Sequence, residues 1–248
     1  ATLGETLRVE RPVHPAVLAS AREVLRIWRA WFRSPTVVPV EAETALADVP
    51  PRPDRSASFF SGGVDSLFTL LDHGTGDGRS ERGPIDELLY VEGFDARIEQ
   101  DRVLANARRN AEEVSAATGR PLRVLRTNVR STRWKEADWA RLSHGSLLTA
   151  LAHLVGRRYA RVFIPSSQSY RAHLPWGSDP YVERVLGPPG TVLRHDGMGY
   201  RRWDKVPLLV PHALFRSRVR VCWESDQGTN CGTCEKCLST MLLLDLAG

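Results

Sequence analysis

Two groups of residues in this sequence have the types and spacing that a chemical site requires. The first is Ser61–Ser66, which reads SGGVDS between the apolar stretch Ser56–Phe60 and the helical run Leu67–Leu71. A strand, a glycine turn and a helix start in this order form an anion site, because free backbone N–H groups and the positive end of the helix dipole converge on the turn. The alternative is an ordinary glycine turn with a helix cap, since Ser and Asp are common there. We expect the loop to bind phosphate.

Each residue of this loop has a distinct expected role. Gly62 and Gly63 let the backbone approach an oxyanion closely and take up positive φ. Ser61 and Ser66 add hydroxyl donors, and the carboxylate of Asp65 is suited to hold Mg²⁺ against the phosphates. The loop lacks the Gly-Lys-Ser or Gly-Lys-Thr of a Walker A motif, so it predicts a different kind of phosphate site.

The second group consists of four cysteines near the C-terminus, namely Cys222, Cys231, Cys234 and Cys237. Their spacing, C-x8-C-x2-C-x2-C, suits one tetrahedral ion. Zn²⁺ is the expected metal, and four thiolates would fill its shell, so we expect a structural site. An iron–sulfur cluster and four free buried cysteines are the alternatives. The site would pin a last helix at 235–246 to a strand at 218–221, with Arg220 and Lys236 offsetting its negative charge.

Length and composition bound the class of protein. The chain has 248 residues, of which 42% are hydrophobic and 25% charged, so it can bury a core. No apolar run approaches the roughly 20 residues of a membrane span, which excludes a transmembrane protein. The formal net charge is +5, but the basic residues are scattered, and this does not favour nucleic-acid binding. Clustered cysteines argue against a disulfide framework, and we expect a cytoplasmic protein.

The apolar pattern predicts an N-terminal part that differs from the rest. Residues 14–32 show the spacing of a helix and 36–40 are β-like, followed by a proline-rich linker at 48–56. From residue 57, short apolar runs alternate with longer helical ones, which predicts an α/β fold with an open, mostly parallel sheet and helices on both faces. The expected strands are 57–60, 87–91, 122–126 and 161–165, and the expected helices are 65–72, 98–118 and 143–157.

The loop sequence SGGVDS resembles the pyrophosphate-binding loop of the N-type ATP pyrophosphatase (PP-loop) superfamily. Together with the cysteine spacing it is similar to 7-cyano-7-deazaguanine synthase, QueC, which has this zinc motif near its C-terminal end. The resemblance implies an adenine nucleotide alpha hydrolase-like fold with ATP, Mg²⁺ and Zn²⁺ as cofactors. It also implies that a carboxylic acid is adenylated and aminated to an amide, then adenylated again and dehydrated to a nitrile.

The same resemblance predicts three segments. They are an N-terminal appendage with its linker at 1–56, an ATP pyrophosphatase domain at 57–215, and a zinc-binding segment with the last helix at 216–248. A typical QueC starts almost at its phosphate loop, and whether 1–56 ends a longer region stays open. The segment 166–180 does not match the family's base-binding sequence. The chain instead resembles an actinobacterial QueC-like branch that shares Pro-Trp-Gly-Ser, His-Asp-Gly and Cys-Glu-Lys-Cys-Leu, so the substrate acid stays open.

Ligands of open α/β sheets lie beyond the carboxyl ends of the strands, and the residues there are further candidates. The resemblance implies an ATP site made of Ser61, Gly62, Gly63, Val64, Asp65, Ser66, Gly93, Phe94, His144, Gly145 and Ser146. The expected substrate residues are Ser166, Ser167, Gln168, Tyr170 and Trp176. The expected catalytic residues are Asp65, Ser61, Ser66 and Lys205, the last because related enzymes have a lysine before a helix there. Outside the loop, a turn, cap or core role is the alternative for each.

The leading hypothesis is an AMP-forming, ATP-dependent ligase. It would activate a carboxylate or amide oxygen of a small-molecule acid or amide and pass the activated group to ammonia or an amine. We expect no membrane partner. Loss of Asp65 is expected to abolish AMP formation and leave the fold intact. One alternative is sulfur transfer to tRNA or a small molecule, which other proteins with this loop perform. Another is an inactive nucleotide-binding or zinc interaction module. The sequence does not decide between a monomer and a homodimer.

Overall fold

The computed structural model describes residues 2–33, 36–46, 48–74 and 83–248. The chain forms two compact units, and each is built from separate stretches of sequence. Unit 1 comprises Ala1–Arg55, Trp134–Val162 and Pro175–Arg194, and unit 2 comprises Ser56–Arg133, Phe163–Leu174 and His195–Gly248. The three consecutive segments expected from the sequence stay a prediction, because these units do not test where an isolated domain would begin or end.

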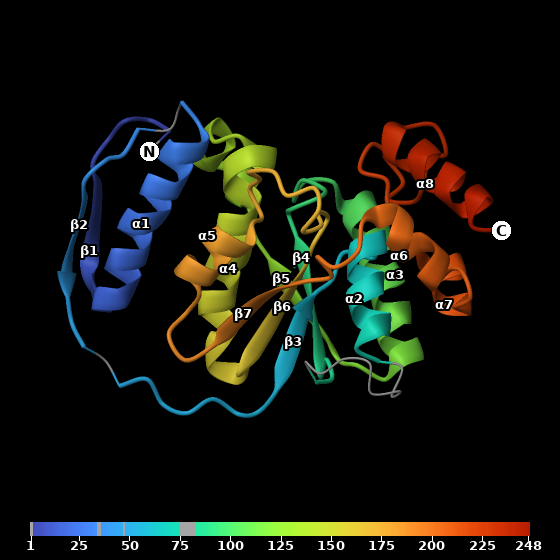
Figure 1. Cartoon of the computed structure of the whole chain (residues 1–248), viewed down its shortest axis with the longest axis horizontal. Coiled ribbons are helices and arrows are strands. Elements are labelled where there is room, and N and C mark those ends of the chain that lie inside the picture. Colours follow the sequence, from blue (N-terminus) through green and yellow to red (C-terminus); the bar gives the residue numbers. More distant parts are fainter. Residues whose placement is uncertain (1, 34–35, 47, 75–82) are drawn as a thin grey trace. The chain divides into compact units, whose positions relative to one another are not determined.

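A five-stranded sheet is the central element of the fold (Figure 1). Its strands are β3 (Ser56–Phe59), β4 (Glu87–Glu92), β5 (Leu122–Arg126), β6 (Arg161–Pro165) and β7 (Val192–Asp196). Their order is β5-β4-β3-β6-β7, and β4 pairs in parallel with both β3 and β5. The structure therefore confirms the predicted α/β class with a mostly parallel sheet and flanking helices. It also places the four strands expected from the apolar runs within one residue of their predicted ends.

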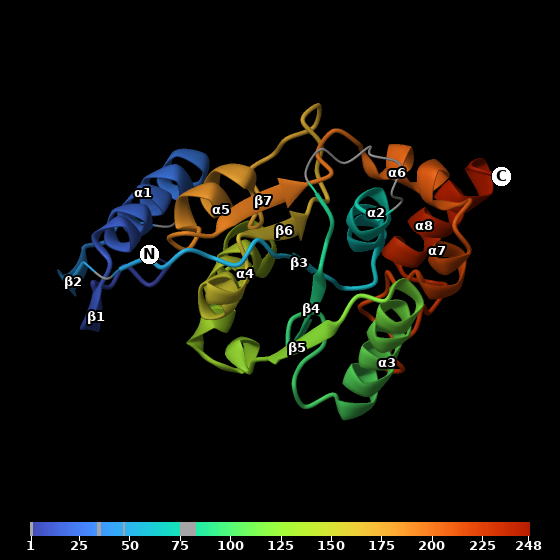
Figure 2. The ribbon, with the colours of Figure 1, turned by 90° about the horizontal axis from the view of Figure 1, so that it is seen from below.

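In unit 2, helices α2 (Val64–Asp72) and α3 (Asp101–Thr118) pack beside strands β3, β4 and β5 (Figures 1 and 2). Helix α2 buries most of its side chains, among them Leu67, Phe68 and Leu70, since it lies within the main core. Helix α3 buries only one stripe and ends at Gly119, whose φ of +66° is the left-handed conformation that commonly terminates helices. The first turn of α2 thus begins directly after a buried strand, where the phosphate loop was predicted.

Unit 1 contains a second, two-stranded parallel sheet of β1 (Leu7–Val13) and β2 (Val40–Thr44). Helix α1 (Pro15–Trp31) packs on it through a small core that includes Leu18 and Leu25. The remaining helices of this unit are α4 (His144–Val155) and α5 (Pro180–Leu186), with a π-helical turn at Trp139–Ser143 before α4. The predicted helix at 14–32 is confirmed, whereas the β-like stretch lies further along the chain than the predicted 36–40.

The C-terminal part of unit 2 departs most from the sequence prediction. Helices α6 (Arg202–Leu209) and α7 (Ala213–Arg218) were not predicted, and α8 (Glu235–Leu246) begins and ends as predicted. The strand expected at 218–221 is absent from the structure, because α7 extends to Arg218 and residues 219–221 form no strand. Short 3₁₀ turns lie at Val129–Ser131, Arg133–Glu136 and Gly156–Arg158.

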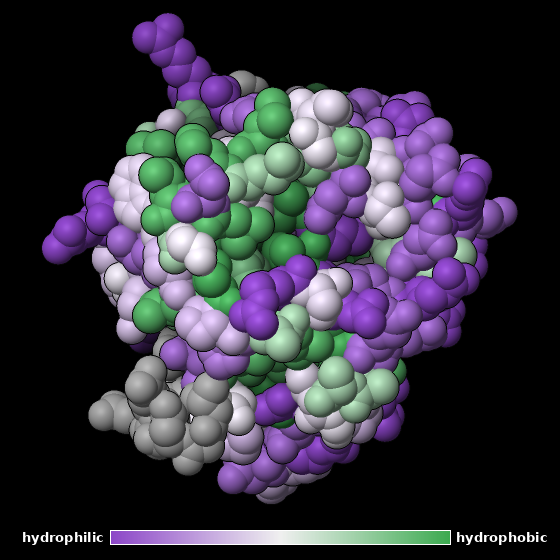
Figure 3. Space-filling view, turned by 90° about the vertical axis from the view of Figure 1, so that its right-hand side faces the viewer, coloured by the Kyte–Doolittle hydropathy of each residue, from purple (hydrophilic) through white to green (hydrophobic). Residues whose placement is uncertain are grey.

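Helix α8 is apolar on more than one side. Leu243 and Leu244 pack against the main core, whereas Leu238, Met241 and Leu242 are exposed. The face of the molecule that carries α8 accordingly shows apolar side chains among polar ones (Figure 3). Within the described residues, no helix combines the length and apolar character that crossing a membrane requires.

Candidate functional site

The loop between β3 and α2 is shaped by its own serines and glycines. The Ser66 hydroxyl donates to the carbonyl of Gly63 at 3.0 Å, and the backbone N–H of Ser61 donates to Ser66 Oγ at 3.4 Å. Gly62 has a φ of +79°, which L side chains rarely adopt, and its carbonyl accepts a 2.8 Å hydrogen bond from the N–H of Arg220. Ser66 is therefore placed to hold the loop in shape.

The N-terminus of α2 is free of a side-chain cap. Gly63 is the N-cap residue, and no side chain caps the helix. The first N–H groups of a helix have no partner within it, and the helix dipole makes this end positive. The first turn of this nine-residue helix therefore keeps the donors that a phosphate group requires.

A polar cavity of about 110 Å³ opens beside this helix end. Its wall contains Ser61, Gly63, Val64 and Asp65 of the predicted loop, with Asp95, Arg202, Arg220, Val221, Cys222, Trp223 and Lys236. Four of the six loop residues thus line one cavity. The wall also contains residues of the cysteine segment and three cations, none of them among the predicted ATP-binding residues.

Asp65 lies at the centre of an ion-pair network. Its Oδ1 accepts a 2.9 Å hydrogen bond from Lys205 Nζ, and its Oδ2 accepts one of 2.7 Å from Arg202 Nη2. Burial alone would raise the pKa of Asp65, but the charges of Lys205 and Arg202 outweigh burial and hold this pKa below its usual value. The carboxylate therefore stays ionised in the folded protein at neutral pH.

Lys205 is the most buried cation of this network, with 1% of its side chain exposed. Its ammonium group donates to the backbone carbonyl of Ser166 as well as to Asp65, and lies 5.4 Å from the centre of the Phe68 ring. Asp65 and the end of strand β6 thus hold Lys205 beside the cavity. The structure brings the predicted pair of Asp65 and Lys205 together.

Arg202 was not among the predicted site residues, and its side chain has a donor to spare. It lines the cavity, and its Nε is buried without a hydrogen-bond partner among the described residues. An unmatched buried donor costs about 1–3 kcal/mol, more when the group is charged. An anion in the cavity would supply the missing acceptor. The doublet Arg201-Arg202 before an apolar helical run was the available sequence signal.

Mg²⁺ was expected at Asp65, but in the structure this carboxylate already pairs with two cations. Both carboxylate oxygens already accept hydrogen bonds from cations, and a metal ion bound there would be repelled by the charges of Arg202 and Lys205. Asp95 lines the same cavity, is exposed, and pairs with no cation of the described chain. Asp95 is therefore the carboxylate that is open to a hard cation in this conformation.

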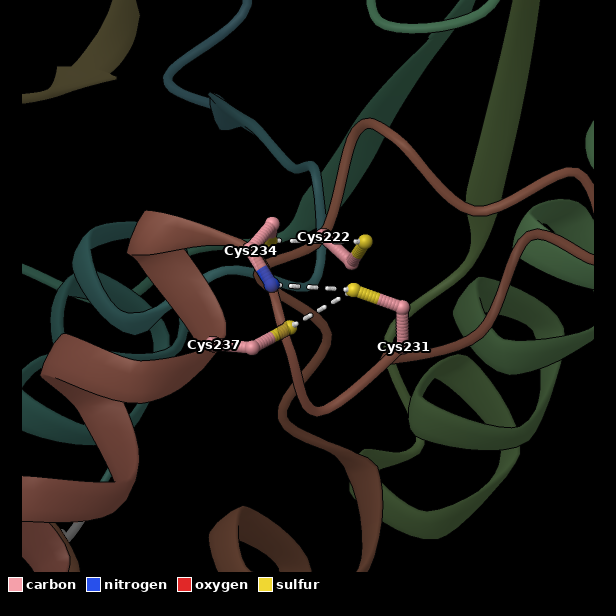
Figure 4. Close-up of side chains that lie close together, drawn as sticks. All are labelled: Cys222, Cys231, Cys234 and Cys237. Carbon is pink, nitrogen blue, oxygen red and sulfur yellow. Dashed lines mark hydrogen bonds between the residues drawn. The ribbon is translucent and has the colours of Figure 1, made fainter.

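The four cysteines form one compact cluster (Figure 4). Their Sγ atoms all lie within 4.8 Å of one another, with 3.8 Å between Cys222 and Cys234 and 3.9 Å between Cys231 and Cys237. A tetrahedral ion with metal–sulfur bonds of about 2.3 Å sets its sulfur atoms roughly 3.8 Å apart. The arrangement therefore fits a single tetrahedral ion, and the cluster could bind a metal as the spacing predicted.

Backbone and side-chain donors surround the sulfur atoms as they do in thiolate sites. The N–H groups of Thr233 and Cys234 donate to Cys231 Sγ, at 3.4 Å and 3.3 Å. The N–H of Ser225 donates to Cys222 Sγ at 3.3 Å. The Thr233 hydroxyl and the N–H groups of Thr233 and Cys234 lower the pKa of Cys231 to about 6. These donors favour the thiolate form of Cys231, which is the form that binds a metal.

Asn230 replaces the strand that was expected before Cys222. Its Oδ1 accepts from the N–H groups of Val221 at 2.8 Å and Cys222 at 3.3 Å, and its Nδ2 donates to the carbonyl of Val219 at 2.8 Å. One amide side chain thus satisfies three backbone groups of 219–222 that a neighbouring strand would otherwise pair. The sequence carried no periodic signal for this contact.

Gly93 and Phe94, expected to bind ATP, do not line the cavity. Gly93 has a φ of +95°, and a Cβ there would overlap the backbone carbonyl of Thr127. Phe94 is buried, and its carbonyl accepts from Arg130. The structure gives both residues a packing role at the end of β4, while the next residue, Asp95, reaches the cavity.

His144, Gly145 and Ser146 belong to unit 1, whereas the phosphate loop belongs to unit 2. The Nδ1 of His144 lies 2.9 Å from the carbonyl of Trp139, and Gly145 lets the chain at Gly177 approach closely. The Ser146 hydroxyl donates to the carbonyl of Leu142 and lines a separate, mostly apolar cavity of about 300 Å³ in unit 1. Their expected contact with ATP stays a prediction.

The predicted substrate residues do not form one group. Ser166 is buried and Gln168 accepts from the N–H of Leu174, so both shape the loop after β6. Ser167 and Tyr170 are exposed, the latter by 76%. Trp176 belongs to unit 1, where its ring centre lies 6.4 Å from that of His144. None of the five lines the cavity beside the loop.

Comparisons with known proteins add little to this geometry. No protein-family profile matches the sequence, and no curated protein is similar to it. One similar solved structure is the U34-tRNA thiolase NcsA from Methanococcus maripaludis with its [4Fe-4S] cluster. It shares 14% sequence identity over 92% of this chain and 72% of its own, with a TM-score of 0.38. A likeness of this size assigns neither a family nor a reaction.

Proposed function

We propose that this protein is an AMP-forming, ATP-dependent enzyme of the PP-loop type. The observation that carries the proposal is the cavity in which the uncapped first turn of α2 meets three cations, one of them with an unpartnered donor. The loop sequence Ser61–Ser66 and its place between β3 and α2 support the same assignment. Polyphosphate is the ligand that such a set of donors and charges would bind.

In the proposed reaction a substrate oxygen attacks the α-phosphorus of ATP, and the bond to pyrophosphate breaks. The helix N–H groups and Arg202 would hold the phosphates, because they offer donors that nothing in the described chain accepts. Lys205 is fixed beside the cavity by Asp65 and would oppose the charge that builds on the phosphate oxygens. The chain would thus act mainly by electrostatic stabilisation.

We propose a carboxylate or amide as the acceptor, followed by displacement of AMP by ammonia or an amine, as in QueC. The pairing of an SGGVDS loop with this cysteine spacing supports the finer assignment. The loop after β6 differs from the QueC sequence, so the substrate acid need not be the same. The proposed metal is Zn²⁺, since the sulfur atoms are spaced for one tetrahedral ion.

The test is product identification by mass spectrometry after incubation of the zinc-loaded protein with ATP, Mg²⁺, ammonium and 7-carboxy-7-deazaguanine. AMP, pyrophosphate and a nitrile are the expected products. If AMP formed only with other carboxylic acids, the proposed activation by ATP would stand and the proposed substrate would be wrong. Failure to bind ATP, or release of ADP in place of AMP, would overturn the proposal. Lys135→Gln is a suitable control, because this lysine is exposed and does not line the cavity.

Sulfur transfer is the second candidate, and one observation favours it. Cys222 lines the same cavity as Asp65, so a cysteine cluster does lie next to the phosphate loop. From the sequence alone this reaction was the weaker alternative, because one structural site accounts for all four thiols. Incubation with ATP, sulfide and tRNA, followed by nucleoside mass spectrometry, separates the two: a thiolated nucleoside would support sulfur transfer and count against amination.

A further inference from the structure

The metal-binding segment forms part of the phosphate cavity. Cys222, Trp223 and Lys236 line it together with Ser61, Gly63 and Asp65 of the loop. Two of these residues are bracketed by cluster cysteines: Trp223 follows Cys222 directly, and Lys236 lies between Cys234 and Cys237. A metal ion that fixes the four thiols therefore also fixes two side chains of the cavity wall.

We propose that Lys236 binds the phosphates of the nucleotide and that the metal ion places it there, so that metal binding and nucleotide binding strengthen each other. This inference rests on the proposed function, because it assumes that the cavity holds a polyphosphate. It adds a phosphate-binding residue from the cysteine segment and a regulatory coupling between the two sites.

The contacts of Lys236 support a binding role over a structural one. Its Nζ lies 3.8 Å from the centre of the Trp223 ring and forms no ion pair or hydrogen bond within the described chain. A cation held on an aromatic face keeps its three N–H donors for another partner. Asp65, Asp95 and Arg202 line the same cavity as Lys236. Lys236 is thus a partly buried cation whose charge faces the same space as the loop.

A direct backbone link ties the loop to the cysteine segment. The N–H of Arg220 donates to the carbonyl of Gly62 at 2.8 Å, and Arg220 Nε donates to the carbonyl of Gly228 at 2.7 Å. Arg220 is buried and also lines the cavity. Movement of residues 219–228 on metal loss would therefore reach both the loop backbone and a second cation of the wall.

Thermodynamic linkage makes the coupling reciprocal. If the metal raises nucleotide affinity by some factor, the nucleotide raises metal affinity by the same factor. A segment that is ordered by metal binding fits this scheme. The entropy cost of ordering it falls on whichever of the metal and the nucleotide binds first, so the second ligand binds more tightly.

The first experiment measures MgATP binding by calorimetry to the metal-loaded wild type and two variants. We expect Lys236→Gln to raise the Kd about tenfold or more, as the loss of a charged hydrogen bond requires. Lys236→Arg, which keeps the charge, should stay closer to the wild type than Lys236→Gln does. Lys135→Gln is the matched control and should bind like the wild type. Metal content is measured on each sample, so that loss of the ion is not mistaken for loss of the lysine.

The second experiment measures metal release and has no catalytic readout. A chromophoric chelator withdraws the metal from the wild type with and without saturating pyrophosphate. We expect pyrophosphate to slow metal release several-fold and to protect Lys236→Gln less. An unchanged Kd for MgATP in Lys236→Gln would overturn the inference, and so would metal release that pyrophosphate does not affect. Neither result would overturn the proposed function as long as the wild type binds ATP. A wild type that binds no ATP would remove the proposed function first.

Discussion

Asp65 serves the site in a way that its residue type alone did not reveal. The sequence analysis gave it a metal, whereas in the structure its two oxygens hold Lys205 and Arg202. A carboxylate that fixes two cations beside a helix N-terminus places positive charge where the proposed phosphates would bind. Its loss should therefore affect the site and the fold together, which changes the expectation drawn from the sequence.

Replacement of Asp65 by Asn and by Ala should separate these two effects. Asp65→Ala leaves Lys205, with 1% of its side chain exposed, without its counter-ion, and breaking such a buried pair costs about 3–5 kcal/mol. Asp65→Asn keeps an acceptor for Lys205 and should cost less. Both variants should lose AMP formation. Urea unfolding and AMP release measured on the same samples provide the check, and full stability in Asp65→Ala would contradict the buried pair.

The pH dependence of the Asp65→Asn effect gives an independent check on the same pair. The pKa of Asp65 is lower in the folded state, so its contribution to stability is complete above its unfolded pKa of about 3.9. That contribution is lost as the pH falls through the folded pKa. The difference in unfolding temperature between the wild type and Asp65→Asn should therefore narrow below pH 4. A constant difference at all acid pH values would count against the ion pair.

At the scale of elements, turns and caps hold the loop, the sheet and the cysteine segment in position. Gly93 follows β4 with a left-handed φ and no space for a side chain, and Asn230 pairs with three backbone groups of 219–222. Each of these contacts helps to place a residue of the cavity wall. Asp95 lies two residues after Gly93, and Arg220 lies in the segment that Asn230 contacts.

Gly93→Ala and Gly119→Ala form a matched pair that tests the role of Gly93. Both positions have positive φ, which costs an L residue about 1–2 kcal/mol, but only Gly93 meets neighbouring backbone. We expect Gly93→Ala to lower the free energy of unfolding clearly more than Gly119→Ala. Thermal and urea unfolding measure this. Equal stability of the two variants, with ATP affinity lost only in Gly93→Ala, would restore the nucleotide-binding role that the sequence analysis gave to Gly93.

At the scale of the whole molecule, metal content and metal removal test both the cysteine cluster and the stability of the chain. We expect one zinc ion per chain by elemental analysis, and a lower unfolding temperature after chelation, since binding to the folded state stabilises it. Helix α8 should keep part of its order without metal, because Leu243 and Leu244 pack on the main core.

Two other results would contradict the zinc site. Less than about a tenth of a metal equivalent in folded protein would remove the metal site. Iron with visible absorbance would identify an iron–sulfur cluster in place of zinc.

The sequence by itself determined four of the five strands of the main sheet, the helices α2, α3 and α8, the glycine loop before α2 and the cluster of cysteines. These features are encoded by residues close together in the chain, through apolar periodicity, glycine turns and fixed cysteine spacing. The predictions for β3, β5, β6 and α8 were accurate for that reason. The strand predicted at 218–221 was wrong because Asn230 replaced the expected backbone partner.

Only the tertiary structure decided what surrounds the loop. Asp65 meets Arg202 and Lys205 across 137 and 140 positions of sequence, and the cysteine segment supplies Lys236 to the same cavity. Local pattern cannot specify such pairs, because it describes which side chains a segment buries and not which distant segment covers them. The charge of the site is therefore a property of the folded chain, in which the helix end, the ion-pair network and the cysteine segment converge.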